Sequence, residues 1–258
     1  MVDKLKFVIA PDFAPQRIPY LEMFSTLLSK QANCSMHLFK PMTPGEAEEA
    51  INNEEPHLIY CNPFMALDLY ESKGYIPVLR PVGKYACDDV VLFTGAESPL
   101  NSPADIKPGM KVTCPGNLGV KTVAMYMDKK LNLGVNFETS ENLQQAIQKV
   151  IRGQADFGIY LHQTFDSLSN LAKSQLKVLD QTDLTAEGYP DIRRVLLMKA
   201  DEDTVATVSK VIIGFKDMPE AKEMLDQIGV GEGFEAITPD MAGSTIANIK
   251  KVREIAGL

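Results

Sequence analysis

Short apolar runs alternate with helically spaced apolar residues along almost the whole chain. In the first part of the chain, apolar side chains stand at every second position or in unbroken runs over residues 4–10, 34–39, 58–61 and 76–81, which is typical of strands. The segments between these runs carry apolar side chains at the spacing of a helix, over residues 18–31, 47–53 and 64–73. Strands that alternate with helices in this way predict an α/β unit.

The same alternation starts again in the middle of the chain. The apolar run 90–94 is predicted to leave the first lobe, and the run 194–198 is predicted to carry the chain back. Between them we expect strands over residues 112–114, 135–138, 156–160 and 177–179 and helices over residues 122–131, 142–152 and 163–172. The remainder is expected to be helical, over residues 203–216, 219–228 and 239–256.

This pattern predicts the fold class and the domain organisation. We expect an α/β protein of two Rossmann-like lobes joined by two crossing strands, with residues 1–91 and 197–258 in lobe 1 and residues 92–196 in lobe 2. Open α/β sheets bind ligands outside the carboxyl ends of their parallel strands. The sequence therefore predicts a ligand cleft between the lobes, bounded by those strand ends.

Three of the predicted helices have a recognisable start. Thr43 is expected to cap a helix, with Pro44 in its first turn and Glu46 three residues after the cap. Asp201 stands near the start of the helix over residues 203–216, and Thr238 is expected to cap the last helix.

The segment Lys111 to Thr122, KVTCPGNLGVKT, is the most informative stretch. It predicts a strand, a sharp turn at Pro115-Gly116 and a helix whose first N–H groups and dipole favour an anion. The alternative is a plain β–α connection in which the glycines serve only the turn. The spacing argues against a nucleotide-binding P-loop, because Val120 separates Gly119 from Lys121.

Composition and charge exclude several classes of protein. With 258 residues, 45% of them hydrophobic and 23% charged, the chain is an ordinary globular protein with one large core or two moderate ones. The net charge of -8 argues against nucleic acid as the main partner. No apolar run is long enough for insertion into a membrane, and the amino terminus leads straight into a strand without a signal peptide. We expect either a cytosolic protein or an exported one whose leader has been replaced.

The four cysteines, Cys34, Cys61, Cys87 and Cys114, are spread singly. The absence of a C-x-x-C pair excludes a zinc ribbon and a thioredoxin-type redox motif. Cys61 and Cys114 each end a predicted strand and Cys87 lies in a loop before the run 90–94, so all three fall where the cleft is expected. Cysteine thiolates in the cleft would select a soft ligand. The simpler interpretation is that the cysteines are buried as free thiols or form up to two disulfides.

Several stretches occur in an order that matches one known family. They are EEPHLIYCNPFMAL, PVGKY, the segment from Glu97 to Gly119, GQADFGIY and IGVGEGFEAITP. The segment from Glu97 to Gly119 is the most specific, since it contains Ser98-Pro99, Ala104-Asp105-Ile106 and the strand from Gly109 to Thr113. In this order the stretches resemble the phosphonate-binding, PhnD-like branch of the type 2 periplasmic solute-binding proteins, and the resemblance covers nearly the whole chain. The resemblance implies two α/β lobes that trap a ligand by hinge closure and perform no chemistry on it.

The chain departs from this family at two places. Phosphonate-binding members have a Ser-Thr-Ser run at the helix start, where this chain has Asn117-Leu118-Gly119. The acidic residue that recognises an amino-phosphonate falls near His162 or Gln163 here, and neither carries a carboxylate. We therefore expect a small compact anion or a neutral oxyacid rather than aminoethyl phosphonate. The chain is similar also to periplasmic sensors of arsenic oxyanions, some of which use a cysteine, and on that interpretation Cys87 is the ligand thiol.

The candidate ligand-binding residues lie at the predicted strand ends and in the loops that follow them. They are Asp12, Phe13, Arg17, Cys61, Asn62, Tyr85, Cys87, Asn117, Leu118, Gly119, Val120, Lys121, Tyr160, His162 and Gln163. Arg17 and Lys121 are expected either to contact an oxyanion or to be solvated. The two tyrosines offer phenol donors or pack at the edge of a lobe, and His162 offers a neutral donor.

The resemblance and the residues together predict a periplasmic solute-binding protein. It is expected to close over phosphate, phosphite, a phosphonate or an arsenic oxyanion and to present it, as a monomer, to an ABC permease or to the sensor domain of a membrane histidine kinase. We expect no catalytic residue, cofactor or metal site. The alternative is a thiol enzyme acting on a small anion, with Cys61 or Cys114 paired with His162.

Overall fold

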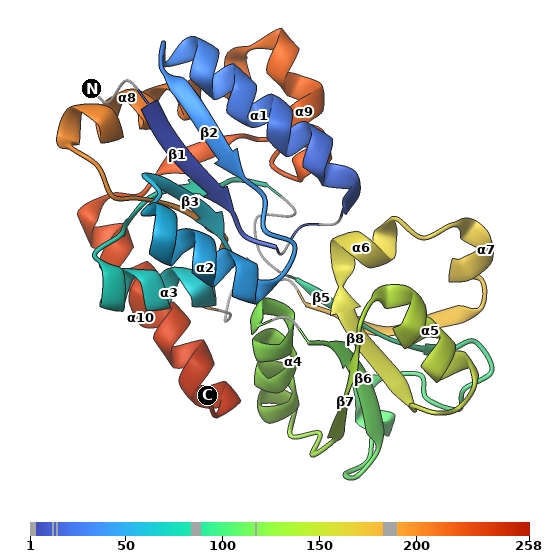
Figure 1. The fold of residues 1–258 in the computed structure, drawn as a ribbon. Helices are drawn as coiled ribbons and strands as arrows, with labels where there is room; N and C mark the ends of the chain where they lie inside the picture. The colour runs from blue at the N-terminus through green and yellow to red at the C-terminus, as the bar shows by residue number, and fades with distance from the viewer. Residues whose placement is uncertain (1–3, 12, 14, 84–88, 117, 183–189) are drawn as a thin grey trace. The chain divides into compact units, whose positions relative to one another are not determined.

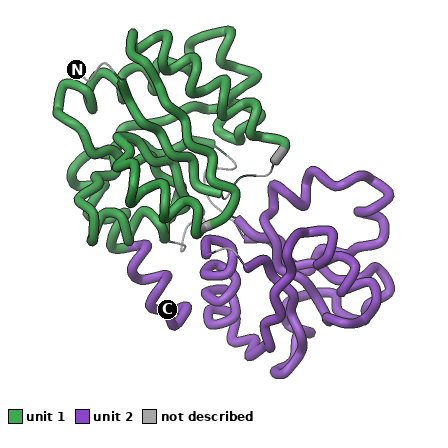
Figure 2. Tube along the Cα trace, viewed as in Figure 1, with its two compact units in different colours: residues 1–87, 192–247 green, residues 88–191, 248–258 purple. Residues whose placement is uncertain are grey.

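The computed structural model describes residues 4–11, 13, 15–83, 89–116, 118–182 and 190–258. The chain forms two compact units (Figure 2): unit 1 contains residues 1–87 and 192–247, and unit 2 contains residues 88–191 and 248–258. None of the helices in the described ranges has both the length and the apolar character that crossing a bilayer requires.

Unit 1 is built on a six-stranded sheet with the order β11-β4-β10-β3-β1-β2. Figure 1 labels β1, β2 and β3 of this sheet. Its strands are β1 (Lys4–Ile9), β2 (Ser35–Phe39), β3 (Leu58–Cys61), β4 (Ile76–Pro81), β10 (Val195–Met198) and β11 (Phe234–Ala236). Strand β1 runs parallel to β2 and β3, whereas β10 is antiparallel to both β3 and β4. Strands β1, β3 and β4 therefore end at the same edge of the sheet, where β10 and β11 begin.

Helices cover both faces of this sheet. One face packs against α1 (Ile18–Gln31), α8 (Glu202–Gly214) and α9 (Lys222–Ile228), and the other against α2 (Pro44–Glu54) and α3 (Pro63–Lys73). The short 3-10 helices η1 (Pro15–Arg17), η3 (Phe215–Asp217) and η4 (Pro219–Ala221) also belong to this unit, as does the last helix, α10 (Pro239–Ala256), up to residue 247. Phe7, Phe24 and Phe215 are fully or almost fully buried on the first face, which explains why alternate residues of β1 are apolar.

Unit 2 is built on a five-stranded sheet with the order β7-β6-β8-β5-β9. Its strands are β5 (Val90–Gly95), β6 (Lys111–Pro115), β7 (Asn136–Ser140), β8 (Phe157–Leu161) and β9 (Leu176–Gln181). Strand β6 is parallel to β7 and β8, and β5 is antiparallel to β8 and β9. Helix α4 (Leu118–Leu131) packs against β5, β6 and β8, and α5 (Leu143–Ile151) joins Phe93 and Tyr160 in an apolar cluster. The short elements are η2 (Pro103–Asp105), α6 (His162–Asp166) and α7 (Asn170–Lys173).

The mixed α/β fold with two sheets confirms the predicted fold class, and most predicted elements are present within a few residues of their predicted bounds. The two predicted helix caps are also present, since Thr43 and Thr238 accept bonds from the N–H groups of Glu46 and Met241. Asp201, which was expected near the start of its helix, caps α8 by accepting from the N–H group of Thr204. The two units differ from the predicted lobes in their bounds at both crossings and in residues 248–258, which belong to unit 2.

Two predictions about the elements are wrong. The helix predicted over residues 163–172 is two short helices, because Ser169 accepts a bond from the N–H of Ala172 and starts α7 anew. The chain after residue 198 is not entirely helical either, because Phe234–Ala236 forms β11 and pairs with β4. Three residues are too few for a periodic pattern, so only the pairing reveals this strand.

Candidate functional site

The candidate residues of unit 1 lie along one edge of its sheet. The loop after β1, the end of β3 and the start of β10 meet there, as the pairing of Ile9 with Tyr60 and of Cys61 with Val195 shows. This is the carboxyl-end edge at which α/β sheets bind ligands.

Phe13 belongs to a stack of aromatic rings and a guanidinium at this edge. The centroid of the Phe13 ring lies 5.3 Å from the centroid of the Tyr60 ring. The guanidinium of Arg194, the residue before β10, lies 4.3 Å from the Phe13 centroid. Arg194 is almost fully buried, and its guanidinium, which carries a permanent positive charge, packs against the Phe13 ring. Phe13 also lines a cavity of about 40 Å³ with Pro11, Lys40 and other neighbours.

Two further candidates make contacts that stabilise unit 1 itself. Arg17 donates from Nη1 to the carbonyl oxygen of Ile228, at the end of α9, at 3.3 Å. Asn62 is buried, and its Oδ1 accepts from the N–H groups of Phe64 and Met65, each at 3.0 Å, which caps α3. The Asn62 side chain, predicted as a donor to the ligand, is thus oriented by its role as a helix cap.

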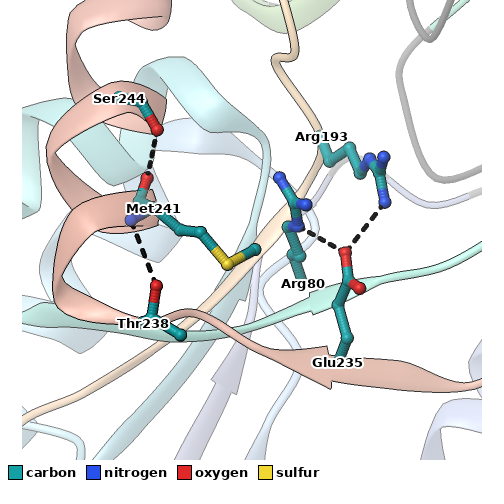
Figure 3. Close-up of polar contacts among 6 residues, drawn as sticks. All are labelled: Arg80, Arg193, Glu235, Thr238, Met241 and Ser244. Atoms are coloured by element: carbon teal, nitrogen blue, oxygen red, sulfur yellow. Dashed lines mark hydrogen bonds and ion pairs between the residues drawn. The ribbon is translucent and has the colours of Figure 1, made fainter.

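A cluster of two arginines and one glutamate completes this edge (Figure 3). Arg80, near the end of β4, donates from Nε to Glu235 Oε1 at 2.6 Å, and Arg193, just before β10, donates from Nη1 to the same oxygen at 3.1 Å. In Figure 3 both guanidiniums point toward Glu235. The figure also shows the start of α10, where Thr238 caps Met241 and Ser244 donates to the Met241 carbonyl. None of these three residues was predicted from the sequence as part of the site.

The candidate residues of unit 2 lie at the corresponding edge of the second sheet. Strands β6, β7 and β8 end there, and α4 begins directly after β6. The first turn of α4 buries Gly119 and Val120, while Lys121 is exposed and the Leu118 side chain is 40% exposed. The Thr122 hydroxyl donates back to the Leu118 carbonyl at 2.7 Å and so is directed along the helix rather than away from its start. Backbone N–H groups and one lysine are therefore the donors that this turn offers an anion.

Gly116 allows the turn into α4 to pass close to β7. A Cβ at this position would lie 3.0 Å from Thr139 Cγ2, a tighter approach than side chains normally make. The predicted role of this glycine in the turn is consistent with that spacing.

The end of β8 contributes Tyr160, His162 and Gln163. Burial, and to a smaller extent the neighbouring Cys114, raises the pKa of the Tyr160 phenol to about 12. The His162 N–H donates to the Asp89 carbonyl at 2.9 Å, and its Nε2 lies 3.5 Å from an Asp166 carboxylate oxygen. His162 and Gln163 are both partly buried at the start of α6.

The described cysteines, Cys34, Cys61 and Cys114, carry thiols. Cys61 and Cys114 do end β3 and β6 as predicted, but their side chains are 0% and 2% exposed. Burial raises the pKa of the Cys114 thiol to about 11, although Lys121 and Lys149 act in the opposite direction. At neutral pH this thiol is protonated and is therefore a poor nucleophile and a poor metal ligand.

The structure thus brings the candidates together within each unit. Phe13, Arg17, Cys61 and Asn62 share the edge of the first sheet, and Leu118 to Lys121 share the edge of the second with Tyr160, His162 and Gln163. Asp12, Tyr85, Cys87 and Asn117 lie outside the described residues. Within the described ranges, no group of histidine, cysteine, aspartate and glutamate is arranged to hold a metal ion.

A family model described as "ABC transporter, phosphonate, periplasmic substrate-binding protein" matches residues 7–242. The chain belongs to this family. The family consists of periplasmic substrate-binding proteins, which bind a small ligand and work with an ABC permease, and not of enzymes.

Solved structures of substrate-binding proteins share the fold of this family member. PhnD1 from Prochlorococcus marinus, in complex with methylphosphonate, has a TM-score of 0.78 and 16% identity, with 99% of each chain covered. A binding protein component of an ABC phosphonate transporter from Pseudomonas aeruginosa has a TM-score of 0.70 and 13% identity over 98% of this chain and 95% of that one. The aliphatic sulphonate binding protein SsuA from Escherichia coli has a TM-score of 0.66 and 12% identity over 98% and 88%. These similarities show that this chain has the type 2 periplasmic-binding-protein fold. No curated protein sequence matches it.

Proposed function

We propose that this protein captures a small phosphorus oxyanion, a phosphonate, phosphite or phosphate, and delivers it to an ABC permease. The observation that carries the proposal is the family match over residues 7–242. Methylphosphonate is the ligand of the similar PhnD1, and we take it as the first ligand to test.

We propose that the anion-binding site is at the start of α4. Its N–H groups and helix dipole provide partial positive charge, and Lys121 adds a full charge on the first turn. Residues 118–121 include no serine, threonine or tyrosine, so anion binding at this site would depend on backbone N–H groups more than on side chains. We propose that Tyr160, His162 and Gln163, at the end of the neighbouring parallel strand, supply further donors.

We favour a phosphorus oxyanion over an arsenic one because of the state of the thiols. Cys61 and Cys114 are buried, and the raised pKa of Cys114 keeps its thiol protonated. An arsenite site or a thiol enzyme using these cysteines would need an accessible thiolate. Arsenic sensing would then depend on Cys87 alone, and Cys87→Ala separates the two: phosphorus oxyanion binding survives this change, whereas arsenite binding is abolished.

We further propose that the protein acts as a monomer that closes on its ligand and thereby signals occupancy to the permease. The ligand would favour the closed form over the open form, because a ligand stabilises the conformation to which it binds more tightly.

Calorimetric titration with methylphosphonate, phosphite, phosphate, sulfate and arsenite, alongside thermal shift, tests the function. We expect binding of one or more phosphorus oxyanions without turnover. Lys121→Gln is expected to weaken that binding about fivefold, since a charge at a helix start contributes about 1 kcal/mol. Lys129→Gln, which makes the same charge change in the last turn of α4, is the matched control. No binding of any phosphorus oxyanion by the folded protein would contradict the proposal.

A further inference from the structure

A cavity of about 530 Å³ lies at the edge of the unit 2 sheet opposite the candidate ligand edge. Strand β5 ends there and β8 and β9 begin there, because β5 is antiparallel to both. The cavity wall is formed by the end of β5, the last two residues of α5, the turn before β8 and the residues before β9. All of its lining residues belong to unit 2. Sites for small ligands have volumes of roughly 300–1,000 Å³, so this cavity is large enough for one.

One part of the cavity wall is apolar. Val150 and Ala155 contribute buried side chains, and Ile151, the last residue of α5, is 42% exposed. A bound aliphatic group would remove part of the Ile151 side chain from water, which is favourable. The wall therefore favours a ligand that has an aliphatic part.

The charged side chains in the described part of the cavity wall are both carboxylates, Glu97 and Asp156. Asp156 Oδ2 accepts the N–H of Lys111 at 2.7 Å, while the Lys111 ammonium lies 3.5 Å from Glu138 Oε1. The exposed Glu97 carboxylate makes neither a hydrogen bond nor an ion pair with any described residue. The carboxyl end of α5, in the same wall, adds partial negative charge. The wall is therefore negative and offers carboxylate oxygens to a donor.

The basic side chains near the cavity make other contacts or lie outside its wall. Lys177 Nζ donates to the Ser98 carbonyl at 2.9 Å. Lys149 lines a neighbouring cavity, and its Nζ donates to the Thr139 carbonyl at 2.8 Å. Arg152, the residue after α5, is exposed and does not line the cavity. The two carboxylates are therefore the described charged groups that a ligand inside the cavity would contact.

The described lining residues include no aromatic ring. Quaternary ammonium ions are typically held by aromatic rings, whereas a primary ammonium group donates hydrogen bonds to oxygen atoms. We propose that this cavity binds a small aliphatic primary amine, with its ammonium groups at Glu97 and Asp156 and its chain against Ile151. The amine site is separate from the proposed anion-binding site, which lies at the other edge of the same sheet.

Calorimetric titration of the protein with 1,4-diaminobutane and with 1,4-butanediol tests the amine site. We expect binding of the diamine and none of the diol, because only the diamine carries ammonium groups. Glu97→Gln should weaken diamine binding about fivefold, since it removes one exposed charge from the site. Glu49→Gln, the same charge change at an exposed position of α2, should leave it unchanged. No binding of the diamine, or equal weakening by the two variants, would overturn the proposal.

The location of the amine is tested by NMR of protein labelled at the isoleucine methyl groups. We expect the Ile151 methyl signal, identified by its loss in Ile151→Val, to shift with the diamine and not with the diol. An Ile151 signal that stays in place while calorimetry reports diamine binding would overturn the assignment to this cavity. Glu97→Gln should bind methylphosphonate as the wild type does, so failure of the amine site and failure of the proposed function are detected separately.

Discussion

Gly158 is a position in unit 2 where only the absence of a side chain is tolerated. A Cβ there would lie 2.4 Å from Phe93 Cζ, and Phe93 is fully buried against Phe165. We expect Gly158→Ala to lower the free energy of unfolding by about 1–3 kcal/mol, because the ring has little room to move. Gly95→Ala, at the end of β5 with nothing near its Cβ, should change it by less than about 0.5 kcal/mol. Urea denaturation measures both, and equal effects would show that Phe93 adapts.

His57 connects the stability of unit 1 to pH. Its Nδ1 accepts the Lys6 N–H at 3.1 Å, which requires the unprotonated nitrogen. Burial and the Lys6 charge lower the pKa of His57 below its ordinary value of 6.5, against an opposing effect of Asp201. Below pH 6.5 the unfolded chain therefore binds more protons than the folded protein at this residue. The contribution of neutral His57 to the free energy of unfolding is therefore present above pH 6.5, and it is lost as the pH falls through the lower pKa that His57 has in the folded protein.

The corresponding experiment measures the free energy of unfolding of the wild type and of His57→Asn between pH 7.5 and pH 5. Asparagine retains an acceptor oxygen and does not titrate, so the variant should lose less stability on acidification than the wild type. His37→Asn, an exposed position on β2, is the control and should behave as the wild type does. Parallel pH profiles for His57→Asn and the wild type would contradict the assignment.

At the scale of elements, the capping residues fix where helices begin at the ligand edge. Asn62→Ala removes an acceptor shared by two N–H groups in a buried place, and we expect a loss of about 1–2 kcal/mol in the free energy of unfolding. Thr43→Ala removes a single exposed cap and should cost about 1 kcal/mol or less. Denaturation midpoints provide the comparison, and an Asn62→Ala protein as stable as Thr43→Ala would show that the buried cap is replaced by water.

At the scale of the whole molecule, the proposed closure predicts a change in size. Small-angle scattering should give a smaller radius of gyration with saturating methylphosphonate than without it, because the proposed closure makes the ligand-bound form the more compact one. Lys121→Gln should need a higher ligand concentration for the same change and should end at the same final size. A radius of gyration that stays constant while calorimetry reports binding would rule out closure.

Most elements were predictable because their causes are local. The helix over residues 18–31 has both ends as predicted, since its apolar spacing and the flanking residues define it. The break after Asp166 was missed because apolar spacing continues through it, while the Ser169 side chain competes for the backbone.

The sequence predicted only those candidate residues that lie at the carboxyl ends of strands. Leu118 to Lys121 and the end of β8 were expected at the same edge, and the parallel pairing of β6 with β8 explains why. Arg80, Arg193 and Glu235 were missed because they are distant in sequence and belong to no motif. The Arg193-Arg194 doublet before an apolar run was the one signal available.

The sequence by itself determined the alternation of strands and helices, the crossing of the chain between two units and the family resemblance, since periodicity and motif order are properties of neighbouring residues. Only the tertiary structure decided which side chains are buried, which thiols are protonated and which arginines share a carboxylate. These depend on the pairing of distant strands and on desolvation, which a linear pattern does not encode.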